Sequence, residues 1–95
     1  MIERHITFTV DPATSEAFDR FFTERYLPAA SASPGYVRVE LLRAADDPSH
    51  YEMTFRWQDG EAAAGWRNSP VHAGLQPELK ALSAMGEIRI FDVVV

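Results

Sequence analysis

The sequence contains no cysteine and only one lysine, Lys80. The absence of cysteine excludes disulfides, thiolate metal sites and cysteine nucleophiles. A domain of 95 residues buries only about two-thirds of the surface that its unfolded chain exposes, so its core is thin. Because no covalent cross-link compensates for this, we expect the chain to gain further burial by oligomerisation.

Positive charge is scarce and dispersed. The eight arginines are scattered along the chain, and the formal net charge is -5. Nucleic acids and anionic membranes bind clusters of Lys and Arg, so neither is an expected partner. No apolar run approaches the roughly 20 residues of a membrane span, and residues 1–5 lack a signal-peptide core. We therefore expect a cytoplasmic protein.

The motifs of several enzyme classes are also missing. The three histidines, His5, His50 and His72, form neither a His-x-His nor an HExxH pattern, so we expect no metal site. There is no GxSxG, GxGxxG or P-loop motif, which removes the usual hydrolase, dinucleotide and nucleotide signals. The hydrophobic share of 46% is nevertheless typical of a folded protein, and the length suits one domain over residues 1–95.

Alternation of apolar and polar residues predicts four strands, three of them with a clear apolar face. They span residues 2–10, 36–43, 50–57 and 87–95. The short loop over 45–49 predicts an antiparallel hairpin between the second and third strands. In the first strand Ile6, Phe8 and Val10 form an apolar row, and His5 lies with the polar row on the opposite face.

Capping signals predict three helices between these strands. The signals are Asp11-Pro12, Asp59 and Ser69-Pro70. The first helix is expected to run to about Leu27, where Pro28 kinks or ends it. The second reaches Trp66, the third is interrupted by Pro77, and the helical region ends at Gly86.

The element order predicts an α+β protein with the ferredoxin-like split βαββαβ arrangement and a four-stranded antiparallel sheet. Helices cover one face of such a sheet, and the apolar rows are their natural partners. The other face is mixed, because it carries Tyr36, Leu42 and Phe91 among charged residues, and the segment 93–95 is apolar on both sides. Both features predict that a second subunit covers this face.

Two segments resemble the antibiotic biosynthesis monooxygenase (ABM) family. The first comprises Phe55-Arg56-Trp57, Asp59-Gly60-Glu61-Ala62, Trp66 and Ser69-Pro70-Val71-His72; the second comprises Ser33-Pro34-Gly35-Tyr36, Leu41-Leu42-Arg43 and Asp47-Pro48. The resemblance covers essentially the whole chain. It implies a homodimer that folds as a dimeric α+β barrel, in which two ferredoxin-like sheets close on each other. The segment from Phe22 to Gly35 is also similar to EthD-type relatives.

The resemblance implies a small cofactor-independent monooxygenase that binds a flat phenolic or hydroquinone molecule beneath the helices. Trp66 matches a tryptophan of haem-degrading members and of a quinone-forming member, and an indole packs on flat ligands. His72 lies where the quinone-forming type has a tyrosine proposed to relay protons, and imidazole can do this near neutral pH. Arg89 is the candidate for the family's arginine near the last strand, which would steady the substrate anion.

Other positions depart from the family patterns. Gln76 stands where haem-degrading relatives have the haem-ligating histidine, and an amide is a poor haem ligand, so we expect no cofactor. Ala62 replaces an asparagine of the quinone-forming pattern. His5 falls roughly where haem-degrading relatives have a strand asparagine, which would turn its side chain toward the helices as a second proton carrier. A register slip of one residue exchanges the two faces, so both orientations of this strand remain open.

Large aromatic residues would form the wall of the substrate pocket. The candidates are Phe18, Phe22, Tyr26, Tyr51 and Phe55. The same residues could simply fill the core. Two other functions remain open: a non-catalytic dimeric ligand-binding or stress-related protein, and an RNA-binding or amino-acid-sensing domain with the same element order. The acidic surroundings of the third strand's aromatics disfavour RNA.

Overall fold

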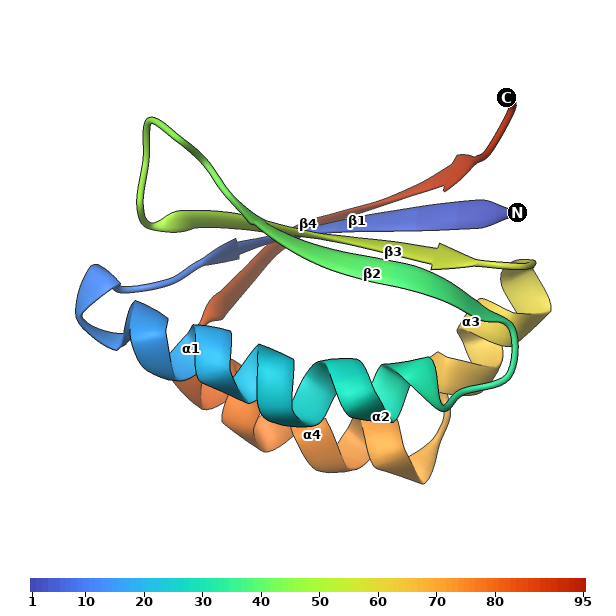
Figure 1. The fold of residues 1–95 in the computed structure, drawn as a ribbon, viewed down its shortest axis with the longest axis horizontal. Coiled ribbons are helices and arrows are strands. Elements are labelled where there is room, and N and C mark those ends of the chain that lie inside the picture. Colours follow the sequence, from blue (N-terminus) through green and yellow to red (C-terminus); the bar gives the residue numbers. More distant parts are fainter.

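The computed structural model describes residues 1–95 as one antiparallel sheet with helices on a single face (Figure 1). The strands are β1 (Ile2–Thr9), β2 (Tyr36–Arg43), β3 (His50–Trp57) and β4 (Ala84–Asp92). They lie in the order β2-β3-β1-β4, so that β1 pairs with both β3 and β4. This confirms the expected ferredoxin-like α+β fold. We call the two sides of the sheet the helix-covered face and the open face.

The helical segments follow the expected capping signals. They are η1 (Pro12–Thr14), α1 (Ser15–Phe21), η2 (Phe22–Tyr26), α2 (Leu27–Ser31), α3 (Gly60–Arg67) and α4 (Pro70–Leu82). The side chain of Asp11 accepts from the N–H of Ala13 at 2.9 Å, and that of Asp59 accepts from Ala62 at 2.8 Å. These contacts satisfy N–H groups that have no partner inside the helix. None of the helices is both long enough and apolar enough to cross a membrane.

The first helical segment continues past Pro28 to Ser31, which corrects the expected end near Leu27. Proline lacks an N–H, and its ring clashes with the carbonyl four residues earlier in a regular helix. Here η2 is a π-helical turn, in which the N–H of Leu27 donates to the carbonyl of Phe22 five residues before it. The wider turn accommodates the proline. Pro77 likewise lies inside α4, which is continuous, so the expected interruption there is wrong.

The last strand begins at Ala84 and ends at Asp92, so Gly86 lies within β4 and does not end the helical region. A Cβ at Gly86 would lie 2.5 Å from Thr7 Oγ1. The N–H of Glu87 donates to the same oxygen at 2.8 Å, and the β1–β4 register shifts beside it. Glycine therefore permits the close approach of two backbones at a β-bulge.

A second register shift changes the facing of residues at the start of β2. Tyr36 pairs with Trp57 and Arg38 pairs with Arg56, so Val37 is the extra residue of a bulge. The Tyr36 ring consequently packs edge-on against Trp57, with centroids 6.1 Å apart, on the helix-covered face. The expectation that Tyr36 lies on the open face is therefore wrong.

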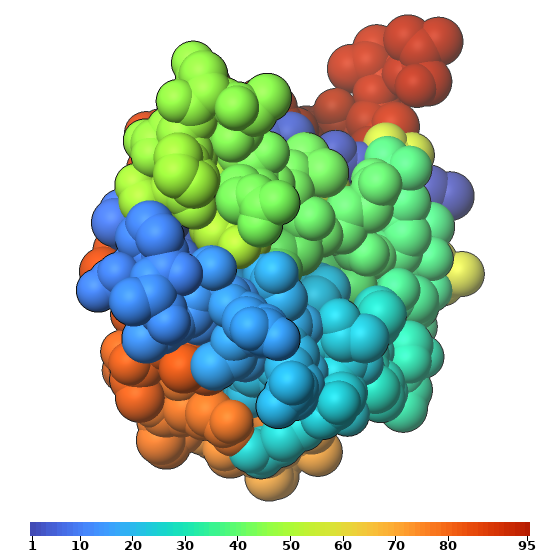
Figure 2. Space-filling view, turned by 60° about the vertical axis from the view of Figure 1, so that its left-hand side comes forward, coloured from blue at the N-terminus to red at the C-terminus, as the bar shows by residue number.

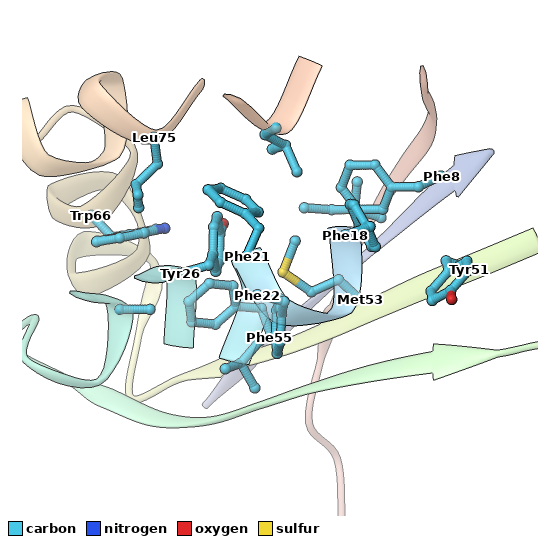
Figure 3. Packing of buried hydrophobic residues seen from close by; sticks show 14 of the residues in the cluster. Phe8, Phe18, Phe21, Phe22, Tyr26, Tyr51, Met53, Phe55, Trp66 and Leu75 are labelled. Atoms are coloured by element: carbon cyan, nitrogen blue, oxygen red, sulfur yellow. The ribbon is translucent and has the colours of Figure 1, made fainter. Parts of the chain in front are cut away.

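The core fills the space between the sheet and the helices. Ile6, Phe8 and Val10 are all buried, so the apolar row of β1 meets the helices and His5 lies on the open face. Of the two orientations that the sequence left open, the structure adopts this one. Figure 3 shows the aromatic side chains of this core as one continuous cluster, with Trp66 at one end and Tyr51 at the other.

Gly35, in the turn before β2, should tolerate no side chain. Its φ is +81°, and a Cβ there would overlap the Cβ of Ala62, which faces this turn. We expect Gly35→Ala to lower the free energy of unfolding by about 2 kcal/mol or more, because left-handed backbone and overpacking both carry a cost. Urea unfolding measures this difference.

The matched control is Gly74→Ala in α4, where nothing lies within 4 Å of an added Cβ. Alanine is the better helix former, so this variant should gain about 0.5–1 kcal/mol. Equal stabilities of the two variants would contradict the role assigned to the turn.

Candidate active site

The candidate site is a cavity of about 200 Å³ between the helix-covered face and α4. Its apolar lining consists of Ile6, Phe8, Met53, Leu79, Met85 and Ile88. Its polar lining consists of Arg4, Tyr26, Arg67, His72 and Gln76. Among these, Arg67, Met85 and Ile88 are exposed, so they form a mouth that opens to solvent beside β4.

A larger and more open groove, of about 880 Å³, lies between the first helical segment and the β2–β3 hairpin. The polar side chains that line this groove already form hydrogen bonds with one another. The hydroxyl of Tyr51 donates to Asp19 Oδ1 at 3.0 Å, and Arg43 donates to the same hydroxyl at 3.4 Å. The cavity beside β4 is the better candidate site, because three residues with shifted pKa values, Arg4, Tyr26 and His72, meet there and the buried Nε of Arg4 has no partner.

His72 is the lining residue whose ordinary pKa lies closest to neutrality. The cap residue Ser69 accepts from the His72 backbone N–H at 3.1 Å, which fixes the first turn of α4. The Gln76 amide donates to His72 Nε2 at 3.2 Å, so the neutral ring carries its proton on Nδ1. Burial, and then the charges of Arg4 and Arg67, lower the pKa of His72. The imidazole is thus neutral at pH 7 and able to accept a proton.

Trp66 lies directly behind this lining. Its side chain is 1% exposed, and its ring lies edge-on to His72 and Tyr26 at centroid distances of 5.4 and 5.8 Å. The buried Nε1 has no hydrogen-bond partner and points to the Tyr26 side of the cluster (Figure 3). The indole therefore contacts the groups that line the cavity, and does not itself line it.

Tyr26 is the one predicted pocket aromatic that lines the cavity. It belongs to the π-helical turn η2 and stacks on Phe22, with ring centroids 5.5 Å apart. Burial raises the pKa of Tyr26, so its hydroxyl stays protonated at neutral pH. A protonated phenol can donate one hydrogen bond to a molecule in the cavity.

The other predicted pocket aromatics lie elsewhere. Phe18 and Phe55 are buried in the core and line neither hollow. Phe22 and Tyr51 line the open groove beside the hairpin. The reason is that a thin core needs large side chains along its whole length, so aromatic content by itself does not locate a pocket.

His5 and Arg89 lie on the open face, on the opposite side of the sheet from Trp66 and His72. The two residues pair directly across β1 and β4. The His5 ring lies 4.7 Å from the Phe91 ring, and the Arg89 guanidinium lies 5.0 Å above the same ring. His5 Nε2 also lies 2.8 Å from Glu3 Oε1. Within one chain, neither residue reaches the cavity.

Arg4 is the site residue that the sequence analysis missed. Its side chain points to the helix-covered face and lines the cavity, although it is only 6% exposed. The sequence does hold a signal for it, because Arg4 continues the row formed by Ile6, Phe8 and Val10. A charged residue within an apolar row is either paired or functional.

Comparisons with known proteins agree with this architecture. Residues 1–78 match the model of the antibiotic biosynthesis monooxygenase family. The chain is 29% identical to the N63A mutant of SnoaB, a cofactor-independent oxygenase from Streptomyces nogalater, with a TM-score of 0.87 over 99% of this chain and 93% of that one. No curated protein sequence matches the chain.

Two further solved structures share the fold at lower identity. HapK from Hahella chejuensis is 19% identical, with a TM-score of 0.88 over 99% of this chain and 93% of that one. A protein from Nitrosomonas europaea, described as a candidate antibiotic biosynthesis monooxygenase, is also 19% identical, with a TM-score of 0.85 over the full length of both chains.

Proposed function

Because this chain belongs to the antibiotic biosynthesis monooxygenase family, we propose that it is a cofactor-independent monooxygenase acting on a flat phenolic or hydroquinone substrate. The observation that carries the proposal is His72, a half-buried imidazole held neutral at the wall of a largely apolar cavity. The similarity to SnoaB, a cofactor-independent oxygenase, supports the same reaction class. Fold alone would not do so, because one fold carries many activities.

The proposed reaction balances without an external reductant. The substrate hydroxyl gives its proton to His72, and the resulting phenolate transfers one electron to dioxygen. The two radicals combine at a ring carbon to form a peroxide, which takes the proton back from His72. Loss of the ring C–H proton and of hydroxide, together as water, leaves a carbonyl. One oxygen atom enters the quinone, the other leaves as water, and the substrate supplies all four electrons.

The residues around the cavity suit this chemistry. His72 acts as the base and then as the acid, and the substrate hydroxyl takes the place at Nε2 that the Gln76 amide holds in this structure. Trp66 holds the rings of His72 and Tyr26 in place from behind. The apolar walls keep water away from the peroxide and strengthen every polar contact made inside.

We further propose that the protein is a homodimer in which the second copy covers β4 and the open face. All nine residues of β4 are exposed, although four of them are large and apolar. Val94 and Val95, beyond the strand, are also exposed, and Figure 2 shows the C-terminal residues standing clear of the rest of the molecule. Apolar surface concentrated on one edge strand is typical of an interface between subunits. His5 and Arg89 then contribute to subunit contact, not to the cavity.

The test is aerobic turnover of anthrone-type and hydroquinone substrates. Oxygen consumption in an electrode cell should match quinone formation by absorbance, one to one. Trp66→Phe keeps an aromatic ring but removes part of the surface against which the His72 ring packs. It should therefore lower kcat by about tenfold. Trp57→Phe is the matched control, since Trp57 is equally buried and also has an unpartnered Nε1, and its ring pairs with that of Trp66 but not with that of His72.

Binding of these molecules without oxygen consumption would contradict the proposed enzyme. It would favour the second candidate, a non-catalytic ligand-binding protein, which the alanine at position 62 in place of the family asparagine supports.

A further inference from the structure

Arg4 is a buried cation without a partner. Its side chain is only 6% exposed, and its Nε is buried with no hydrogen-bond partner. None of the ion pairs of the structure includes Arg4. An unpaired guanidinium destabilises a folded protein, so its presence calls for an explanation outside the folded chain's own contacts.

The surroundings of Arg4 add positive charge and no negative charge. Arg67 lies at the mouth of the same cavity, the His72 ring on its wall is neutral, and none of the residues that line it is acidic. Burial, and then the charge of Arg67, lower the pKa of Arg4, although an arginine stays charged at neutral pH. The whole chain carries a net charge of -5, whereas the charged residues that line this cavity, Arg4 and Arg67, are both positive.

We propose that Arg4, together with Arg67 at the mouth, binds an ionised oxygen, so that the cavity takes its ligand as an aromatic oxyanion. A guanidinium presents a planar set of donors that suits a phenolate, an enolate or a carboxylate. The Tyr26 hydroxyl offers a further donor, and the apolar walls fit the aromatic skeleton. An anion bound there would supply the partner that Arg4 lacks.

This inference deepens the proposed function and rests on it in one respect only. The proposed reaction begins with a phenolate, and a cation beside that oxygen would favour the ionised form over the phenol. The anion-binding role that the family resemblance suggested for Arg89 therefore passes to Arg4, because Arg89 lies on the other face of the sheet.

The test compares two probes of the same shape, 2-naphthoate and 2-naphthamide, by isothermal titration calorimetry. The wild type should bind the carboxylate about tenfold or more tightly than the neutral amide. Added NaCl should weaken binding of the carboxylate and leave that of the amide unchanged. Arg4→Met should lose the preference, whereas Arg20→Met, which removes an exposed arginine of α1, should keep it.

Thermal unfolding without ligand separates binding from a structural role. Arg4→Met replaces an uncompensated charge by an apolar side chain, so its Tm should rise. A fall in Tm would mean that Arg4 supports the fold. Arg4→Gln, which keeps a polar side chain, gives the same comparison of probes if the methionine variant does not fold.

The outcomes also distinguish this inference from the proposed function. Equal wild-type affinity for the two probes would overturn the role of Arg4, whether or not the protein consumes oxygen. A preference for the carboxylate that depends on Arg4, in a protein that oxidises none of the substrates offered, would support the oxyanion site and contradict the monooxygenase.

Discussion

Replacing His72 with alanine is expected to lower kcat for quinone formation by about 100-fold or more, because a positioned acid–base group contributes rate factors of this order. No other residue that lines the cavity can replace it. The two arginines keep their protons, Gln76 does not titrate, and burial raises the pKa of Tyr26. Steady-state oxygen consumption measures the loss.

The pH dependence of turnover should also report the protonation of His72. Because burial and the two arginines lower the pKa of His72 below its ordinary 6.5, the ring is neutral and basic throughout the neutral range. Turnover should be flat there and fall only on the acid side of pH 6.5. The unfolded chain binds a proton at this residue at a higher pH than the folded chain. His72 therefore makes folding less favourable as the pH falls from about 6.5 through its lowered pKa.

The control for His72 is His50→Ala, since His50 lies on the strand face opposite the cavity, 4.0 Å from Glu52. This variant should keep both the wild-type kcat and the fall in turnover on the acid side of pH 6.5. An unchanged pH–rate profile in the His72 variant would remove His72 from the mechanism.

Placing glutamates at Leu42 and Phe91 is expected to raise the dimer dissociation constant by about 100-fold or more. Both side chains lie on the open face, where they are 47% and 37% exposed in one chain, so the folded monomer should lose little stability. Beneath a second copy, each new carboxylate would lose its hydration; the one at position 42 would also face Glu52, and the one at position 91 would have only Arg89 and His5 to offset the loss. Sedimentation equilibrium should show the wild type at twice 10.7 kDa and the double variant as a single chain.

The matched control is Val71→Glu, because Val71 is 54% exposed on α4, on the other side of the molecule from the open face. That variant should remain dimeric. A wild-type protein that sediments as one chain would contradict the dimer and leave the exposed apolar residues of β4 without an explanation.

The sequence by itself determined the element order and most element starts. Asp59 and Ser69 cap their helices as their chemistry requires, and the alternation in β1 places Ile6 in the core. These features depend on neighbours within a few residues along the chain, which a sequence displays directly. The family resemblance named both His72 and Trp66 as site residues, and the structure brings their rings to 5.4 Å from each other.

Only the tertiary structure decided which residues share a cavity. His5 and Arg4 are adjacent in sequence but point to opposite faces of the sheet. Arg89 lies on the open face with His5 because the two residues pair across β1 and β4. The bulge at Val37 turns Tyr36 to the helix-covered face, where it packs against the core, and a π-helical turn lets the first helical segment continue past Pro28. Each outcome depends on how strands pair or helices pack, and one extra residue in a ladder or turn changes the direction of a side chain.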